Sequence, residues 1–317
     1  MYKNPFPYSD DNLRYHTYSY YLKHKYRQKV CKVPLNAGFT CPNRDGSKGF
    51  GGCRFCSESG SGEFVKDPLL PLEQQYEEGI AQMHHKWPDA LGIAYFQAYS
   101  NTYGTPEHIK EILEPFAARE DIAEISVATR PDCLNEEKIE YLSELSKRKP
   151  LSVEMGLQSI HDSTMEKMNR GHSAEELYEK VAMLKEKNIR TTLHIINGLP
   201  NETPEMMLET AKKVAELQVD GIKIHMLNIL KSSALYQDYK KEPFELLSLE
   251  EYVDIVVRQL EVLPPEMVIE RVTGDGMEEE LIAPLWIKKK TVVRNEIAKL
   301  QLKRDSYQGK YYETGKH

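Results

Sequence analysis

Six short apolar runs, separated by amphipathic stretches, recur along the chain and limit the folds open to it. Each run is continuous and rich in β-branched residues, which is typical of parallel strands buried on both faces. The runs cover residues 30–35, 91–96, 122–128, 151–157, 189–196 and 221–227. Such alternation of strands and helices predicts right-handed crossovers and either a doubly wound sheet or a barrel.

The stretches between the runs carry helix-start signals. Thr105-Pro106-Glu107 and Thr203-Pro204-Glu205 each offer an N-cap, a proline in the first turn and an acid that complements the helix dipole. Ser173 to Glu176 and Ser248 to Glu251 have the spacing of capping boxes. We therefore expect each strand to be followed by a helix.

Polar clusters follow the strands and decide between the two architectures. They are Gln97 to Thr102, Thr129 to Asp132, Gln158-Ser159 and Asn197 to Asn201. Residues from many strand ends converge when the strands surround a common mouth, as in TIM-type barrels. Six units rather than eight predict an α/β fold with an incomplete, laterally open (β/α)6 TIM-type barrel.

Three cysteines, Cys41, Cys53 and Cys56, are spaced C-x11-C-x2-C in one glycine-rich loop after the first strand. Three thiolates from one loop can hold three irons of a 4Fe-4S cluster and leave the fourth iron open to a small molecule. The loop would then hang over the barrel mouth. These residue types and this spacing predict a 4Fe-4S site.

A zinc site and a disulfide framework are two other possible uses of the cysteines. Zinc takes four ligands, commonly two pairs, and here His84 and His85 are adjacent while neither Cys31 nor Cys133 belongs to a pair. A disulfide framework is disfavoured because the cysteine count is odd and the N-terminal residues do not resemble a signal peptide. We expect Cys31 and Cys133 to be core or incidental thiols.

Composition indicates the environment of the protein and a candidate partner surface. The 317 residues are 40% hydrophobic and 29% charged, and no apolar run is long enough to cross a membrane, so we expect a cytoplasmic protein. Although the net charge is -7, both terminal regions are basic and rich in tyrosine. This pattern fits a phosphate-backbone footprint with stacking rings, or else solvated helix faces. The candidate contacts are Arg14, Lys23, Lys25, Arg27, Lys288, Lys289, Lys290 and Arg294.

These features predict three regions. Residues 1–29 form the basic N-terminal segment, 30–240 the barrel, and 241–317 a C-terminal extension with a basic helix and tail. Within the extension we expect a helix over 248–263, a strand over 267–272 and a final helix over about 288–304. The segment Leu281 to Trp286 is expected to pack the extension down, with base stacking by Trp286 as the alternative. We expect the extension to close the side of the barrel and to help dock the substrate.

Four segments carry a family resemblance: Gly38 to Gly46, Tyr95 to Ala98, Thr129 to Asp132 and Met168 to His172. With the cysteine loop and the six-unit barrel, they identify the chain as resembling the radical S-adenosylmethionine (SAM) superfamily over roughly residues 32–239. The resemblance is greatest to the branch of the elongator catalytic subunit and, within it, to the YtqA-like subgroup. It implies a 4Fe-4S cluster on Cys41, Cys53 and Cys56, and SAM as the second cofactor.

The resemblance also implies where SAM is held. The methionyl amine would lie against residues Gln97, Ala98, Tyr99, Ser100 and Asn101, where the chain departs from the usual glycine-glycine-glutamate segment, and Thr129 would lie nearby. Arg170 would pair with the carboxylate, unless it is a surface arginine. Glu154 and Gln158 would reach the ribose, unless Glu154 forms an internal salt bridge. Phe55, Leu199 and Pro200 would cover the adenine.

Other polar residues on the predicted strands have open roles. His194, His225 and Lys223 are candidates for substrate binding or proton transfer, and satisfied core histidines are an equal alternative. We assign no general base. Arg130 and Asp132 form either a structural pair or part of the site.

The implied activity is conversion of the carboxymethylaminomethyl group of wobble uridine in transfer RNA (tRNA) to aminomethyl, which prepares it for methylation by a separate enzyme. A 5'-deoxyadenosyl radical would remove hydrogen from the carbon between amine and carboxylate. Oxidation to an imine and hydrolysis would then release a two-carbon acid. The implied electron donor is a flavodoxin or ferredoxin. Two alternatives are a radical SAM enzyme with a small-molecule substrate and a catalytically silent iron-sulfur RNA-binding module.

Overall fold

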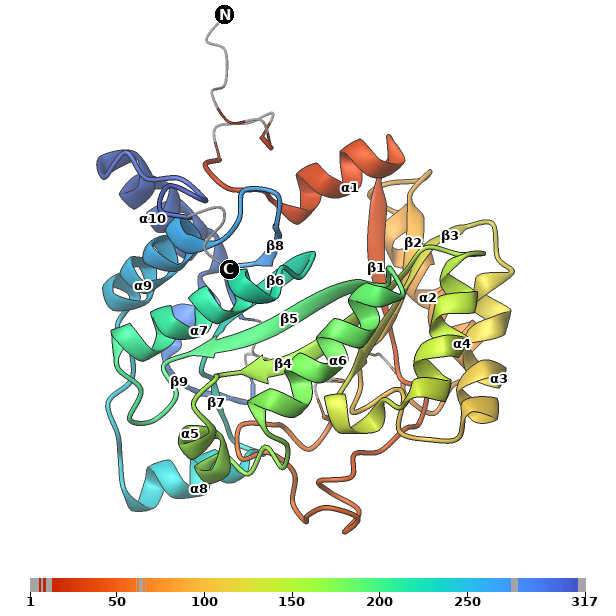
Figure 1. The fold of residues 1–317 in the computed structure, drawn as a ribbon, viewed down its shortest axis with the longest axis horizontal. Helices are drawn as coiled ribbons and strands as arrows, with labels where there is room; N and C mark the ends of the chain where they lie inside the picture. The colour runs from red at the N-terminus through yellow and green to blue at the C-terminus, as the bar shows by residue number, and fades with distance from the viewer. Residues whose placement is uncertain are drawn as a thin grey trace, which may run out of the picture. The chain divides into compact units, whose positions relative to one another are not determined.

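A computed structural model describes residues 6, 8–9, 13–60, 62, 65, 67–274 and 279–312 of the chain (Figure 1). The tail 313–317, residues 275–278 and parts of the first twelve residues, all within predicted segments, lie outside the described residues. The helices are α1 Tyr18–Tyr26, α2 Leu72–His84, α3 Pro106–Ala117, α4 Glu136–Ser146, α5 Asp162–Lys167, α6 Ala174–Glu186, α7 Pro204–Leu217, α8 Ala234–Lys241, α9 Leu249–Val262 and α10 Lys290–Lys303. The strands are β1 Val30–Leu35, β2 Leu91–Phe96, β3 Ile122–Thr129, β4 Leu151–Gln158, β5 Arg190–Asn197, β6 Gly221–Met226, β7 Ile229–Leu230, β8 Val268–Arg271 and β9 Leu281–Ala283.

The six predicted strands are confirmed, with ends that differ by a residue at most. Together with β8 they lie in one sheet in the order β1-β2-β3-β4-β5-β6-β8, which is that of an incomplete barrel. At the β8 edge, Thr17 forms an isolated parallel bridge with Ile269. Pairs β1–β2, β2–β3, β3–β4 and β6–β8 are parallel. The strand predicted in the C-terminal extension is β8, and it adds a seventh strand to this sheet beside β6.

The chain divides into two compact units. One comprises Leu22–Gly156 and Arg170–Thr192, and the other comprises Met1–Tyr21, Leu157–Asn169 and Leu193–His317. We call them the cysteine unit and the terminal unit, because the first holds the cysteine loop and the second holds both chain termini. The predicted boundaries at 29/30 and 240/241 stay predictions.

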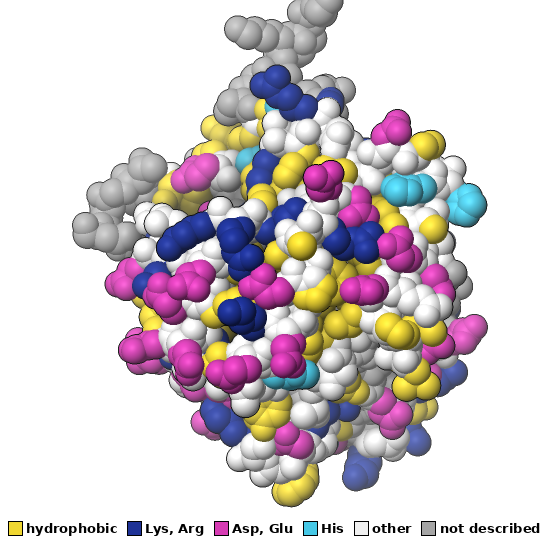
Figure 2. Space-filling model, turned by 90° about the vertical axis from the view of Figure 1, so that its right-hand side faces the viewer, with side chains coloured by type: hydrophobic (Ala, Val, Ile, Leu, Met, Phe, Trp, Pro, Cys, Tyr) yellow, Lys and Arg dark blue, Asp and Glu magenta, His cyan; other side chains and the backbone are white. Residues whose placement is uncertain are grey.

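In the cysteine unit, α2 packs on β1, and α3 packs on β3 and α4 (Figure 1). Thr105 begins α3 as predicted, since its side chain accepts from the His108 backbone N–H. Asn135 and Ser173 cap α4 and α6 in the same way. On the face in Figure 2, Lys and Arg side chains are interspersed with Asp and Glu.

In the terminal unit, α9 packs between α7 and α10. Ser248 and Glu251 form both halves of the predicted capping box at the start of α9. Trp286 packs as predicted: its ring lies 5.3 Å from that of Tyr252, and its Nε1 donates to the Leu247 carbonyl at 3.0 Å. Among the described residues, no helix is long and apolar enough to cross a membrane.

Candidate functional site

The loop after β1 folds back on itself and brings the three cysteines together. The Arg44 N–H donates to the Cys41 carbonyl at 2.8 Å, and the Gly52 N–H donates to the Asn43 carbonyl at 2.8 Å. Gly52 has φ +75°, a left-handed conformation that favours glycine, and a Cβ there would come within 2.7 Å of Arg44 Nε. The glycine-rich sequence therefore supplies the tight turn that returns the chain from Cys41 to Cys53.

The three thiols are free and influence one another. A hydrogen bond from Cys56 lowers the pKa of Cys53 to about 7 against the opposing effect of burial, and the positive charge of Arg130 assists. The same hydrogen bond, together with burial and the charge of Cys53, raises the pKa of Cys56 well above its usual value. Cys41 adds to the repulsion at Cys56, so all three sulfurs share one environment.

This donor set fits a 4Fe-4S cluster. Three thiols from one loop, with arginines beside Cys53, offer one ligand to each of three irons and offset the negative charge of the cluster. Among the described residues, no group of three or more His, Cys, Asp and Glu side chains is placed to hold a single metal ion. Cys31 and Cys133 are buried as predicted, and burial raises the pKa of Cys133 to about 12.

Arg44 fastens the end of the loop. Its guanidinium donates to the carbonyls of Ser57 and, at 3.1 Å, Glu58, and lies 5.4 Å from the centroid of the Tyr99 ring. The backbone N–H of Tyr99 donates to the Gly60 carbonyl at 2.9 Å, and a Cβ on Gly60 would clash with the Tyr99 ring at 2.3 Å. The cysteine loop is thus packed directly on the segment that follows β2.

The segment after β2 leaves polar atoms for a ligand. Asn101 Nδ2 donates to the carbonyls of Phe96, Ala98 and Ala128 at 3.0 to 3.1 Å, which fixes the orientation of the amide. Within the part of the chain that the structure describes, the buried atoms Asn101 Oδ1 and Gln97 Nε2 have no hydrogen-bond partner. Such orphaned atoms favour a bound polar group here, as expected for the methionyl end of SAM. Thr129, in contrast, is paired with Thr102 at 2.6 Å.

Arg170 is buried with 1% of its surface exposed, so the surface alternative is wrong. Its Nε donates to the His172 carbonyl at 2.9 Å, and its own carbonyl accepts from Arg130 Nη1 at 2.7 Å. Burial and the charges of Arg170 and Arg130 lower the pKa of His172 to about 3, so that imidazole is neutral. The residues around Arg170 therefore form a cationic site suited to a carboxylate.

Glu154 has the internal ion pair that sequence reasoning left open. Its carboxylate accepts from Lys32 Nζ at 2.6 Å, Ser126 Oγ at 2.9 Å and Tyr95 Oη at 2.9 Å. These donors come from β1, β3 and β2, so the four strands of the cysteine unit meet at this carboxylate. A contact between Glu154 and ribose stays a prediction, as does the covering of adenine by the half-buried Phe55.

The remaining predicted residues lie in the terminal unit. His194 on β5 and His225 on β6 bring their ring centroids to 5.3 Å, and Lys223 is buried two residues before His225. Leu199 is buried in the loop after β5, and Pro200 is half-buried. Gln158 ends β4 in a left-handed conformation, φ 57°. No general base is assigned.

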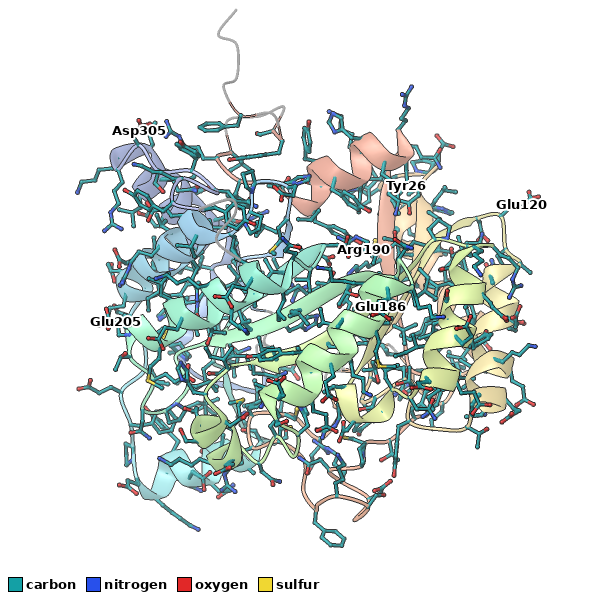
Figure 3. The ribbon with its side chains drawn as sticks, viewed as in Figure 1. Tyr26, Glu120, Glu186, Arg190, Glu205 and Asp305 are labelled. Carbon is teal, nitrogen blue, oxygen red and sulfur yellow. The ribbon has the colours of Figure 1, made fainter. Side chains whose placement is uncertain are left out.

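Most of the predicted nucleic-acid contacts are exposed side chains, and two of them form ion pairs within the chain. Lys23, Arg27, Lys288, Lys289, Lys290 and Arg294 are exposed. Lys25 instead forms an ion pair at 3.0 Å with Glu124, a buried residue that also accepts at 2.8 Å from Tyr26, which is labelled in Figure 3. Arg14 pairs with Asp305 at 2.8 Å, and its carbonyl accepts from the Gln308 N–H at 2.9 Å. The basic N-terminal and C-terminal segments therefore meet in the terminal unit.

A parallel partial barrel with three clustered cysteines after its first strand defines the class of radical SAM proteins. Sequence comparison agrees. Residues 40–214 match the radical SAM superfamily, and residues 219–301 match the Radical_SAM C-terminal domain. The chain is 47% identical over 313 residues to YtqA of Bacillus subtilis, covering 99% of this chain and 97% of the relative. It belongs to the radical SAM superfamily, in the Elp3-like branch, and is an enzyme that uses a 4Fe-4S cluster and SAM.

More distant proteins share part of the sequence or the fold. A protein of Methanocaldococcus infernus called tRNA uridine(34) acetyltransferase is 25% identical over 154 residues, which cover 48% of this chain and 28% of that protein. The structure of the archaeal Elp3 from the same organism superposes with a TM-score of 0.67 at 17% identity, over 89% of this chain and 64% of that chain. At this identity the structural match shows the shared fold.

Several residues of the site escaped sequence reasoning. Lys32 lies in an apolar strand, and a charged residue in such a run is itself a signal of a buried ion pair. Asn43 and Lys48 lie within the cysteine loop, where the sequence pattern pointed only to the cysteines. Asn43 Nδ2 lies 3.8 Å from Cys53 Sγ, and Lys48 pairs with Asp132 at 3.1 Å.

Changing Cys53 to Ala is expected to abolish a SAM-responsive 4Fe-4S signal in electron paramagnetic resonance (EPR) of the reconstituted protein, because each cysteine serves a different iron. Cys41→Ala and Cys56→Ala should behave alike. The buried thiols Cys31 and Cys133 provide controls, and their Ala variants should keep the signal. A normal signal from Cys53→Ala would show that the ligand assignment is wrong.

Changing Arg170 to Lys keeps the charge and removes the planar fork, so SAM affinity should fall about tenfold or more. Equilibrium binding of SAM to the reconstituted protein measures it. Arg148, which is 54% exposed and binds Glu114 through two hydrogen bonds, gives the matched control. Equal SAM affinity in Arg170→Lys and Arg148→Lys would contradict the carboxylate-binding role.

Proposed function

We propose that this enzyme remodels the side chain of the wobble uridine of tRNA, converting carboxymethylaminomethyl-uridine to aminomethyl-uridine. The observation that carries the RNA part of the proposal is the meeting of two basic, tyrosine-rich segments in the terminal unit. Arg14 and Asp305 join them at 2.8 Å, and Tyr8 Oη also donates to the Gln308 carbonyl at 3.2 Å. Two segments that are remote in sequence thus form one surface.

Charge on the terminal unit supports an RNA partner. Lys288, Lys289 and Lys290 are exposed at the start of α10. Arg271 and Arg294 lie close enough to Lys290 that their charges, added to partial burial, lower its pKa. Tyr307 and Tyr311 are exposed by 37% and 60%. Exposed cations and exposed aromatic rings on one unit are the features that grip phosphates and stack on bases.

The relatives support the choice of base. The Methanocaldococcus infernus protein with a related segment is named for uridine 34 of tRNA, the wobble position. By that likeness we assign a uridine at this position as the substrate here.

The proposed chemistry fits this setting. When bound, the cluster and SAM supply a 5'-deoxyadenosyl radical able to take hydrogen from an unactivated carbon. The carbon between amine and carboxylate of the substrate is oxidised by two electrons, which the reductive cleavage of one SAM to methionine and 5'-deoxyadenosine takes up. Hydrolysis of the resulting imine gives the aminomethyl group and a two-carbon aldehyde acid. A flavodoxin or ferredoxin is the proposed source of the initiating electron.

The substrate is tested directly in cells. Modified nucleosides of bulk tRNA from cells with and without this gene should differ by accumulation of carboxymethylaminomethyl-uridine and loss of aminomethyl-uridine and its methylated product. Liquid chromatography with mass spectrometry measures all three. An unchanged nucleoside profile would favour the small-molecule alternative, and purified protein that never cleaves SAM would favour the silent RNA-binding module.

Changing Lys288, Lys289 and Lys290 together to Ala should weaken tRNA binding and make its salt dependence shallower. Each lost phosphate contact reduces the log-log slope by roughly 0.7 to 0.9. A matched control removes three exposed lysines elsewhere, Lys110, Lys147 and Lys212. Filter binding across salt concentrations gives the slope, while cluster assembly should stay intact. Equal slopes for both triple variants would show that the α10 lysines do not belong to the docking surface.

A further inference from the structure

A buried ion pair follows directly after β3. Arg130 Nε and Nη2 donate to the two carboxylate oxygens of Asp132 at 2.9 and 2.8 Å, and the side chains are only 11% and 1% exposed. Burial works to raise the pKa of Asp132, but the hydrogen bonds and charge of Arg130, joined by Lys48, keep it below its usual value. Burying such a pair contributes little net stability, because desolvation offsets the attraction. Its position is therefore more informative than its energy.

The pair joins three segments around Cys53. From Arg130, the remaining donor Nη1 reaches the Arg170 carbonyl at 2.7 Å. Asp132 Oδ2 forms an ion pair at 3.1 Å with Lys48 Nζ of the cysteine loop. Lys48 also lies 3.5 Å from Glu176 on α6. One guanidinium and one carboxylate thus connect the cysteine loop, the end of β3 and the Arg170 segment.

The Arg170 segment in turn touches the cysteine loop. The Arg170 carbonyl that Arg130 binds lies 4.0 Å from Cys53 Sγ. Asn43, whose Nδ2 is 3.8 Å from the same sulfur, leaves no room at Gly171: a Cβ there would lie 3.0 Å from Asn43 Oδ1, and Gly171 has φ +76°. Because this backbone fits so closely, moving the Arg170 carbonyl would displace both the Cys53 environment and the Arg170 side chain.

We propose that Arg130 is a positioning residue that sets the place of Arg170 relative to Cys53, and so couples SAM binding to the cluster. Its positioning effect runs through the Arg170 carbonyl, which its Nη1 binds at 2.7 Å, and adds to the effect of its charge on Cys53. Outer-shell residues of this kind orient the groups that bind a metal or ligand, and losing them typically costs ten- to a hundredfold in affinity or activity. The proposal concerns the cofactor site and is independent of the RNA substrate.

Arg130→Lys tests it, since lysine keeps the charge and cannot bind both Asp132 oxygens and the Arg170 carbonyl at once. The three cysteines are intact, so the cluster should assemble with its ordinary iron content and absorbance. SAM affinity of the reconstituted protein should fall about tenfold or more, and the EPR change on adding SAM should diminish. In the metal-free protein, amide hydrogen exchange of residues 170–173 should accelerate.

The chain offers a close control at the opposite end of the same strand. Arg119 binds Asp121 with the same two-residue spacing and the same fork geometry, at 2.9 and 2.8 Å, just before β3. Arg119→Lys removes a pair of the same fork geometry, although Arg119 also binds Glu77 at 2.6 Å and the pair is more exposed, at 27% and 44%. It should leave SAM affinity and exchange at 170–173 unchanged. A loss of affinity as large as in Arg130→Lys would show that weakened packing of β3, rather than positioning, is responsible.

A second variant decides the matter if Arg130→Lys does not fold. Asp132→Asn retains the side-chain shape and loses the charge that orients Arg130, so SAM affinity should fall in the same direction by severalfold. Asp121→Asn is its control. SAM binding as tight as in the parent protein, in folded Arg130→Lys or in Asp132→Asn with an intact cluster, would overturn the proposal.

Discussion

The parallel arrangement of β1 to β4 is the constraint on which the site of the cysteine unit depends. Parallel strands end at the same edge of a sheet, and these four lie side by side in chain order. Their registers place Leu35 opposite Phe96, Phe96 opposite Val127 and Thr129 opposite Met155, so successive strands end within three residues of one another. The cysteine loop, the segment 97–102 and the Arg130–Asp132 pair therefore become neighbours without any direct sequence relation.

The two ends of these strands carry different polar contacts. At the amino ends, Lys25 and Tyr26 bind Oε2 of Glu124, and Tyr76 donates to the Asp121 carbonyl at 3.2 Å. Among the described residues, Glu124 Oε1 at this end and Asn101 Oδ1 and Gln97 Nε2 at the carboxyl ends have no hydrogen-bond partner. The two orphaned atoms that follow β2 are in the segment packed on the cysteine loop, at the end of the strands where barrels of this kind bind their ligands.

Buried charge in the cysteine unit fixes geometry more than it stabilises the fold. Glu154 accepts hydrogen bonds from donors on three other strands, and Asp132 forms ion pairs with Arg130 and Lys48. Each arrangement costs desolvation that the ion pairs only offset, so a hydrophobic replacement would pack at least as well. What such networks provide is a single orientation for each side chain, which a site that handles a reactive radical requires.

The sequence by itself determined the strands of the main sheet, several helix starts and the superfamily, because each depends on local patterns: apolar runs, N-caps and cysteine spacing within one loop. Tertiary structure decided which polar residues meet. It put Lys25, predicted on an RNA surface, against Glu124, and it buried Arg170. It also joined Arg14 to Asp305 and placed β8 in the main sheet. These outcomes depend on strand register and on contacts between residues tens to hundreds of positions apart, and no local pattern in the chain encodes such distances.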